Sequence, residues 1–318
     1  MKDNIDKLIG NTPLIKINYK YKDKLRSIYA KLEYYNLTGS IKDRMAYYII
    51  KEAKKNGMLK DRQAIVEATS GNTGISISAL GAYFKHEVHI FMPDWVSIER
   101  RKLMELYGAK IYLVSRSDGG FQEAIRRADE YAKIINGYRP NQFDNEDNVM
   151  AHYKATVEEI LSKVNATSIV LGVGTGGTLM GIGKRLKEID SSIKVLAMEP
   201  KSLPLLSEGI NIGSHKIEGI GDDFIPNIVD KNIIDEVVVI DDVDAINMAK
   251  MLASELGLGV GISSGANFLA SALANDNKTT VTVFADDNKK YLSTNLVDKI
   301  NTDNLISKDI ELVNYEVL

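Results

Sequence analysis

The chain has 318 residues, of which 44% are apolar and 26% charged, a composition typical of a soluble globular protein with room for about two domains. Its formal net charge of -3 shows no basic excess, so we expect neither nucleic acid nor a membrane surface as a partner. The absence of cysteine excludes disulfides, thiol nucleophiles and thiolate metal sites, and no metal ion is expected. The sequence has no apolar leader and no long uncharged apolar run, which favours a cytoplasmic enzyme.

Short runs rich in Val and Ile alternate with amphipathic segments along most of the chain. The runs predict strands at Ala64–Ala68, Glu87–Met92, Lys110–Val114, Ser168–Val173, Lys194–Met198 and Thr280–Phe284. The segments predict helices at Asp43–Lys55, Asn72–Lys85, Ile98–Tyr107, Gly120–Ile135, Ala151–Lys163, Leu179–Glu188 and Val243–Leu256. This alternation is typical of βαβ units and predicts an α/β fold with mainly parallel sheets flanked by helices. So many units favour two sheets over one.

The sequence offers few signals of a domain boundary. The polar loop Asn136–Asn148, which carries Gly137 and Pro140, is the one candidate. The C-terminal stretch Asn301–Leu318 carries no glycine-rich or catalytic motif. It is either an edge strand or an interface tail.

The clearest motif is Gly174–Thr178 (GTGGT), which follows an apolar strand and begins a helix. Glycines at such a turn let backbone N–H groups converge on a phosphate, and the helix N-terminus favours the anion. A tight turn without a ligand is the alternative. The seven residues Gly172–Thr178 include four glycines and two threonines, which favours the anion site.

The same stretch also fits a dinucleotide fingerprint. Gly172, Gly174 and Gly177 match GxGxxG, and Glu199 follows about twenty residues on, where a ribose-binding acid is expected. An NAD(P)-dependent oxidoreductase is therefore an alternative function. It leaves a second cluster of polar loops, nearer the N-terminus, without a role.

That cluster begins with Thr38–Arg44 (TGSIKDR), which places Lys42 at the beginning of an amphipathic helix. A lysine near a positive helix end and a phosphate site is suited to forming a Schiff base with an aldehyde cofactor. Taken alone, Lys42 fits a solvated helix face better. Thr69–Gly74 (TSGNTG) then predicts a second anion pocket, of the size of a carboxylate, with an ordinary capped turn as the alternative. A third polar loop, Gly261–Ala266 (GISSGA), begins another helix.

These four motifs, in this order, resemble those of the cysteine synthase family, which together with the cystathionine β-synthases uses pyridoxal phosphate (PLP) on the type II fold. The resemblance runs from Ile9–Leu14 (IGNTPL) to Lys290–Thr294 (KYLST), nearly the whole chain. It implies a fold like that of the tryptophan synthase β-subunit and a homodimer. It also implies a smaller mobile domain over residues 36–146 and a larger domain over 1–35 and 147–318.

The resemblance implies a role for each matched position. Lys42 would form the Schiff base and then move the Cα proton of the substrate. The cofactor phosphate would be bound by Gly174, Thr175, Gly176, Gly177 and Thr178. Asn72 would contact the pyridine 3′-oxygen, and Ser264 the pyridine nitrogen. The substrate carboxylate would be bound by Thr69, Ser70, Thr73 and Gln142. A hydroxyl facing that nitrogen does not enforce its protonation as a carboxylate does. The resulting weaker electron sink fits β-elimination through an aminoacrylate better than transamination.

One segment departs from the family pattern. Plain cysteine synthases carry small residues in the middle of Gly219–Pro226 (GIGDDFIP), and cystathionine β-synthases resemble GIGYDFIP, so Asp222 is the unusual acid and Asp223 the family-like one. A carboxylate near the β-carbon repels hydrosulfide and can accept a proton from water or from an amino-acid thiol. We predict Asp222 as this base and Asp223 as the fallback; a solvated acidic turn is the alternative.

The sequence therefore predicts a PLP-dependent enzyme that eliminates or replaces the β-substituent of a small L-amino acid, with sulfide or a thiol leaving or entering. Release of hydrogen sulfide from L-cysteine, giving L-serine or lanthionine, is the favoured reaction. Cysteine synthesis from O-acetylserine and cystathionine synthesis are alternatives within the family. An NAD(P)-dependent oxidoreductase and a binding protein without turnover are alternatives outside it.

Overall fold

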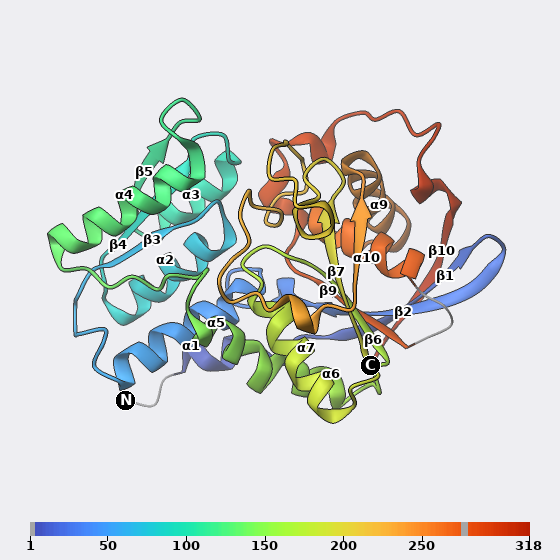
Figure 1. Ribbon diagram of the computed structural model, residues 1–318, viewed down its shortest axis with the longest axis horizontal. Helices are drawn as coiled ribbons and strands as arrows, with labels where there is room; N and C mark the ends of the chain where they lie inside the picture. The colour runs from blue at the N-terminus through green and yellow to red at the C-terminus, as the bar shows by residue number, and fades with distance from the viewer. Residues whose placement is uncertain (1–3, 275–278) are drawn as a thin grey trace.

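Two β-sheets organise the chain, of which the computed structural model describes residues 4–274 and 279–318 (Figure 1). The larger sheet has the strand order β10-β1-β2-β9-β6-β7-β8, and the smaller has the order β3-β4-β5. Among the described strands, β1 pairs antiparallel with β2 and β10, and the other pairs are parallel. The predicted α/β class and the preference for two sheets are confirmed. The strands are β1 (Leu14–Tyr21), β2 (Lys24–Leu32), β3 (Ile65–Ala68), β4 (Val88–Pro93), β5 (Lys110–Val114), β6 (Ser168–Gly172), β7 (Lys194–Pro200), β8 (Glu236–Ile240), β9 (Thr280–Phe284) and β10 (Ile310–Val317).

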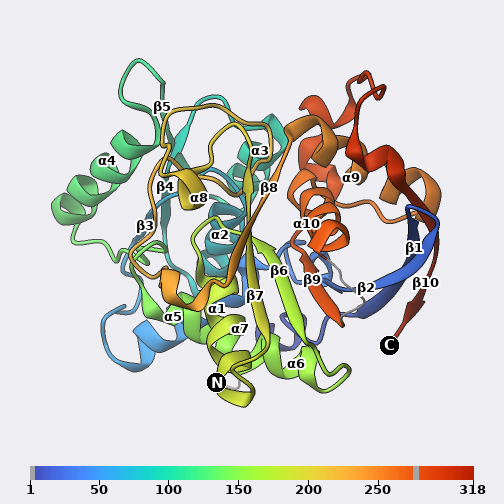
Figure 2. The same cartoon turned by 45° about the vertical axis from the view of Figure 1, so that its right-hand side comes forward.

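Helices cover both sheets, and Figure 2 shows the strands β8, β7, β6 and β9 side by side between them. No helix in the two described ranges is long and apolar enough to cross a membrane. The α-helices are α1 (Lys42–Lys55), α2 (Asn72–Phe84), α3 (Ile98–Leu106), α4 (Gly120–Ile135), α5 (Glu146–Ala151), α6 (Val157–Leu161), α7 (Gly177–Ile189), α8 (Leu205–Glu208), α9 (Asp242–Leu256) and α10 (Ile262–Ala274). Short 3-10 helices lie at Ile5–Leu8, Glu33–Tyr35, Lys231–Ile233, Asn288–Tyr291, Asn295–Val297 and Ile306–Asp309, and a π-helical turn at His152–Thr156.

Both sheets are buried between their helices. In the larger sheet, the Tyr19 and Phe268 rings meet edge to face at 5.5 Å among residues of β1, α9 and α10. Its other face packs against α7. Every position of β3 and β4 is buried, because helices lie on both faces of a parallel sheet. Continuous apolar runs therefore identified these strands correctly from the sequence.

Other elements differ from the expectation. β1, β2 and β8 were not predicted, although Ile15, Ile17 and Tyr19 of β1 point inward with the period of two that a strand requires. The C-terminal stretch forms β10 at the edge of the larger sheet, which resolves the open choice in favour of an edge strand. The helix predicted over Ala151–Lys163 is interrupted by the π-helical turn. All three strands of the smaller sheet fall within residues 36–146, and the mobility of that part stays a prediction.

A buried cluster of four charged side chains fixes α1 against β2 and α6. Arg44 donates to Glu33 at 2.6 Å and to Glu159 at 2.7 Å, and Lys31 lies 2.6 Å from Glu159. The two positive and two negative charges balance. Burial raises the pKa of Glu33, but Arg44 and Lys31 outweigh this effect and bring it to about 2. The cluster thus holds the helix that begins at Lys42.

We expect Glu33→Gln to lower the free energy of unfolding by about 3–5 kcal/mol, because Arg44 and Lys31 would then share one carboxylate in a buried place. Urea denaturation measures this change. The matched control, Glu311→Gln, removes an exposed ion pair with Lys20 and should cost less than about 1 kcal/mol. The lowered pKa of Glu33 contributes stability that is fully present above pH 4.5, the ordinary pKa of a glutamate. This stability is lost as the pH falls through about 2. Equal stability of the two variants would contradict the account of the cluster.

Candidate active site

A cleft lies where loops that follow strands of both sheets meet, the usual place of a ligand site in α/β folds. One part is lined by predicted residues from three separate motifs, together with Gln142 and Asp222; the motif residues are Lys42, Thr69, Ser70, Asn72, Thr73, Gly174 and Thr175. An adjoining part is lined by Gly176, Thr178 and Ser263 among others. The predicted residues Gly177, Ser264 and Asp223 line neither part.

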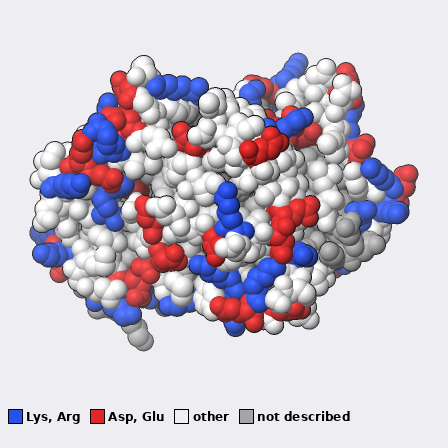
Figure 3. Space-filling model, viewed as in Figure 1, with Lys and Arg blue, Asp and Glu red and all other residues white. Residues whose placement is uncertain are grey.

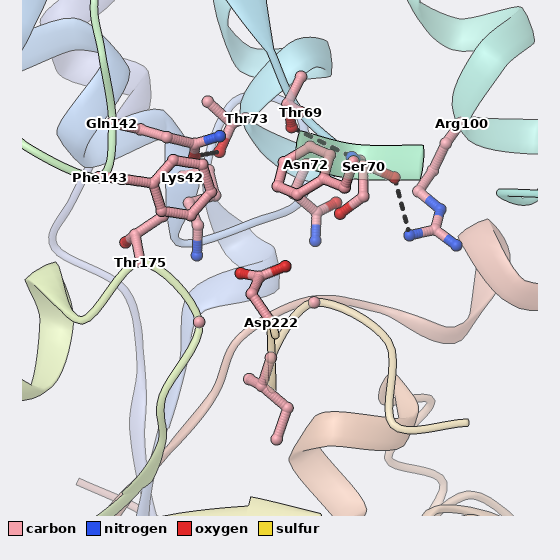
Figure 4. Close-up of a pocket in the computed structure, with 15 residues that line it drawn as sticks. Lys42, Thr69, Ser70, Asn72, Thr73, Arg100, Gln142, Phe143, Thr175 and Asp222 are labelled. Carbon is pink, nitrogen blue, oxygen red and sulfur yellow. Dashed lines mark hydrogen bonds between the residues drawn. The ribbon is translucent and has the colours of Figure 1, made fainter. Parts of the chain in front are cut away.

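Lys42 is the first residue of α1 and points across the cleft toward Asp222 (Figure 4). Burial lowers its pKa, and the charges of Asp286 and Asp222 partly oppose this shift. A lysine amine with a lowered pKa is a better nucleophile and proton acceptor at neutral pH than a solvated one. The solvated helix face is therefore the wrong reading of this lysine.

The loop Gly174–Thr178 leads from β6 into α7, and its glycine positions leave no room for a side chain. Gly176 has φ +88°, in the left-handed region, and a Cβ on Gly177 would lie 2.0 Å from Asn148 Oδ1. The Asn148 amide donates to Thr175 Oγ1 at 2.9 Å. The loop therefore presents backbone N–H groups at a helix N-terminus, which suits a phosphate.

His152 lies behind this loop and was not predicted as part of the site. Its Nε2 lies 3.3 Å from Thr178 Oγ1, and its Nδ1 lies 2.9 Å from Thr156 Oγ1 within the π-helical turn. Burial lowers the pKa of His152 to about 3, with the charge of Arg44 adding to the shift. The imidazole is therefore neutral and orients the Thr178 hydroxyl.

The predicted substrate loop, Thr69–Gly74, joins the end of β3 to α2. Thr73 Oγ1 donates to Gln142 Oε1 at 2.6 Å, and Gln142 Nε2 donates to the Ala68 carbonyl at 2.9 Å. Thr69 Oγ1 accepts the N–H of Gly71 at 3.2 Å. Thr73 and Gln142, to which the family resemblance gives the same role, thus lie together in one polar wall of the cleft.

Buried polar atoms without a partner lie beside this wall, at Asn72 and Asp286. Asn72 Nδ2 donates to Asp286 Oδ2 at 2.7 Å, and the Tyr291 hydroxyl donates to the same oxygen. Asn72 Oδ1 and Asp286 Oδ1 are buried with no hydrogen-bond partner, as expected where a ligand completes a site. Ser264 Oγ accepts the Ala285 N–H at 3.1 Å and keeps its own hydrogen to donate.

Asp222 and Asp223 have different surroundings. Asp222 lines the cleft opposite Lys42, whereas Asp223 is exposed and accepts a hydrogen bond from Gln122 Nε2 at 3.2 Å. Burial and the neighbouring Asp223 raise the pKa of Asp222 to about 7, although Lys42 lowers it. Asp222 therefore lines the part of the cleft beside Lys42, whereas Asp223 lines only its outer mouth.

Sequence reasoning missed several lining residues. Arg100, Phe121 and Phe143 line the cleft beside the predicted groups. Phe121 and Phe143 meet edge to face at 5.7 Å and form an apolar wall. The signal for Arg100 was hidden, because it stands in a charged run of α3 that resembles a solvated helix face, yet its side chain is 2% exposed.

The acid proposed for a dinucleotide ribose is already engaged. The Glu199 carboxylate accepts the N–H of Leu206 at 2.6 Å and the N–H of Ser207 at 3.0 Å. It therefore caps the short helix α8. This use of Glu199 argues against the oxidoreductase alternative.

Three comparisons relate the chain to known proteins. A family model described as "Pyridoxal-phosphate dependent enzyme" matches residues 5–286. Cysteine synthase B of Campylobacter jejuni is 43% identical over 92% of this chain and 98% of that protein. A hydrogen sulfide-producing enzyme from Fusobacterium nucleatum superposes with a TM-score of 0.94 at 49% identity, covering 99% of this chain and 97% of that one.

A further solved structure shows a hydrogen sulfide-producing enzyme in an intermediate state. It is an aspartate-to-asparagine variant complexed with an α-aminoacrylate intermediate. It superposes with a TM-score of 0.94 at 48% identity and covers 98% of both chains.

Proposed function

The chain belongs to the family of pyridoxal-phosphate-dependent enzymes, and on that premise we propose that it releases hydrogen sulfide from L-cysteine. Water adding at the β-carbon gives L-serine, and a second cysteine adding there gives lanthionine, with one hydrogen sulfide released in either case. The reaction belongs to the β-elimination and β-replacement chemistry with sulfide that the named relatives represent.

The residues around the cleft fit the cofactor. The N–H groups of Gly174–Thr178 would hold the phosphate, the second amide hydrogen of Asn72 Nδ2 would be donated to the 3′-oxygen, and the hydroxyl of Ser264 would donate to the ring nitrogen. PLP, when bound, supplies an electron sink that stabilises negative charge at the Cα of an amino acid.

The chain's own groups divide the remaining work. Lys42, with its lowered pKa, holds the cofactor and moves the Cα proton. The polar wall of Thr69, Ser70, Thr73 and Gln142 binds the substrate carboxylate. Phe121 and Phe143 form an apolar wall beside these polar groups.

The observation that carries the choice of reaction is the placement of Asp222. Its carboxyl lies in the cleft opposite Lys42, and its pKa near 7 suits a base at neutral pH. A negative charge there disfavours the hydrosulfide anion relative to neutral water or a neutral thiol. The loss of sulfide is therefore favoured over its addition.

Cysteine synthesis from O-acetylserine and sulfide is the second candidate, because the Campylobacter jejuni relative bears that enzyme's name. The same active-site groups would serve it, with sulfide as the entering nucleophile. The substrates that turn over fastest decide between the two reactions.

We further propose a homodimer that acts in the cytoplasm. Tyr315 and Val317 of the edge strand β10 are 40% and 67% exposed, and a second copy would shield such apolar side chains from water. Both signs of charge interleave over the face in Figure 3, which offers no continuous basic surface for nucleic acid. Analytical ultracentrifugation tests the dimer.

We expect Lys42→Ala to abolish covalent attachment of PLP. Borohydride reduction followed by mass spectrometry should find PLP on the parent protein and none on the variant. Lys55→Ala, which changes an exposed lysine of the same helix, should keep the label. A colourless parent protein that binds NAD at full occupancy would contradict the proposal and favour the oxidoreductase alternative.

We expect Thr73→Val to raise the KM for L-cysteine about tenfold, because the hydrogen bond from the Thr73 hydroxyl to the substrate carboxylate is lost. The Kd for PLP should stay within about twofold. Thr73→Ser keeps the hydroxyl and is the matched control. Titration of apoenzyme with PLP and steady-state kinetics measure the two constants. Equal weakening of both would contradict the division of roles.

We expect Asp222→Asn to slow steady-state sulfide release by about a hundred- to ten-thousandfold, after one rapid release per active site. The rate of the parent enzyme should rise with pH through about 7, as the Asp222 carboxyl loses its proton, and the variant should lack this rise. Asp223→Asn keeps an oxygen that can accept from Gln122 and should keep the rate above pH 7, but its rise should move to lower pH, because the charge of Asp223 no longer raises the pKa of Asp222. Parent-like release by Asp222→Asn would make cysteine synthesis the better assignment.

A further inference from the structure

The segment Glu218–Asp223 crosses the mouth of the cleft and is held at both ends by the smaller sheet's helices. At one end, the Glu218 carboxylate forms an ion pair with Arg100 of α3. At the other end, Asp223 accepts a hydrogen bond from Gln122 of α4 at 3.2 Å. Asp222 lies between these two contacts.

Arg100 is built into the structure rather than placed on its surface. Its side chain is 2% exposed, its Nε donates to Ser97 Oγ at 2.8 Å, and its Nη1 donates to the Ser70 carbonyl at 3.3 Å. Its guanidinium lies 5.1 Å from the centre of the Tyr291 ring. A buried positive charge needs a negative partner, and the Glu218 carboxylate is the one next to it.

The backbone of the segment has little stiffness of its own. Gly219 and Gly221 have φ of +91° and +70°, and both flank the single residue Ile220. One backbone hydrogen bond, from Gly221 N–H to the Val173 carbonyl at 3.0 Å, ties this part to the loop after β6. His215 Nε2 also lies 2.7 Å from the Gly221 carbonyl oxygen. The place of Asp222 therefore depends on these contacts of Gly221 and on the contacts at the ends of the segment.

We propose that the Arg100–Glu218 ion pair is a positioning contact that holds the Asp222 carboxyl in the cleft. The inference rests on the proposed role of Asp222 as the base. Arg100 also donates to the Ser70 carbonyl in the substrate loop. One residue therefore contacts both the loop that binds the substrate and the segment that carries the base. The base is thereby in place only while both sides of the cleft are held together.

The test uses Glu218→Gln in the PLP-loaded enzyme, because Glu218 is 27% exposed, whereas a change at buried Arg100 also removes its hydrogen bonds to Ser97 and Ser70. Circular dichroism checks that the variant is folded. We expect kcat for sulfide release from L-cysteine to fall about ten- to a hundredfold, the cost of a misplaced catalytic group, with KM within about twofold. Glu218→Asp, which keeps the charge, should restore part of kcat. Lys216→Gln, which changes an exposed charge near the same mouth, should match the parent.

A double-mutant cycle with Asp222→Asn separates the inference from the proposed function. Because Glu218 acts through Asp222, adding Glu218→Gln to Asp222→Asn should lower kcat no further, whereas a general structural role would add its full effect. A parent-like kcat for Glu218→Gln beside a slow Asp222→Asn would overturn the positioning role alone. A parent-like Asp222→Asn would overturn the proposed function itself.

Discussion

The opposition of Lys42 and Asp222 across one cleft is the interaction on which the site depends. The two groups come from different parts of the fold, one from the beginning of α1 and the other from the segment after β7 (Figure 4). The Glu33–Arg44–Glu159–Lys31 cluster holds the first, and the Arg100–Glu218 pair is proposed to hold the second. These two sets of ionic contacts thus act on the elements that carry the two reactive groups.

Burial moves the pKa values of these two groups toward each other. It lowers the pKa of Lys42 and raises that of Asp222 to about 7, because each loses water that would solvate its charged form. Each therefore exchanges protons more readily near neutral pH than a solvated counterpart would. The same carboxylate opposes the entry of an anionic nucleophile, so one residue influences both the rate and the direction of the reaction.

Much of the site could be predicted from the sequence because its motifs are local. In a glycine-rich turn between a buried strand and a helix, as at Gly174–Thr178, adjacent residues supply all the N–H groups that bind the anion. The three motif loops and Asp222 accordingly meet in one cleft. The runs rich in apolar residues at β3 and β4 identified strands for a similar reason. These strands are buried on both faces, so short local runs indicate them without an alternation of polar and apolar residues.

The rest depends on contacts between residues far apart in the chain. Arg100 belongs to a charged helical run, and only the packing of α3 against Tyr291 and Glu218 reveals its burial. Asp286 stands in a polar turn, and only tertiary structure places it against Asn72. The π-helical turn that aims His152 at Thr178 has no periodic signature, because a turn of five residues interrupts the helical pattern without ending it.

Incubation of the PLP-loaded enzyme with L-cysteine in ¹⁸O-labelled water tests the central claim most directly. If Asp222 activates water at the β-carbon, the account predicts L-serine with ¹⁸O in its hydroxyl group, formed together with hydrogen sulfide, and one sulfide for each serine or lanthionine. Release of sulfide with pyruvate and ammonia as the only other products would contradict it. So would an enzyme that is inert toward L-cysteine but converts O-acetylserine and sulfide to cysteine.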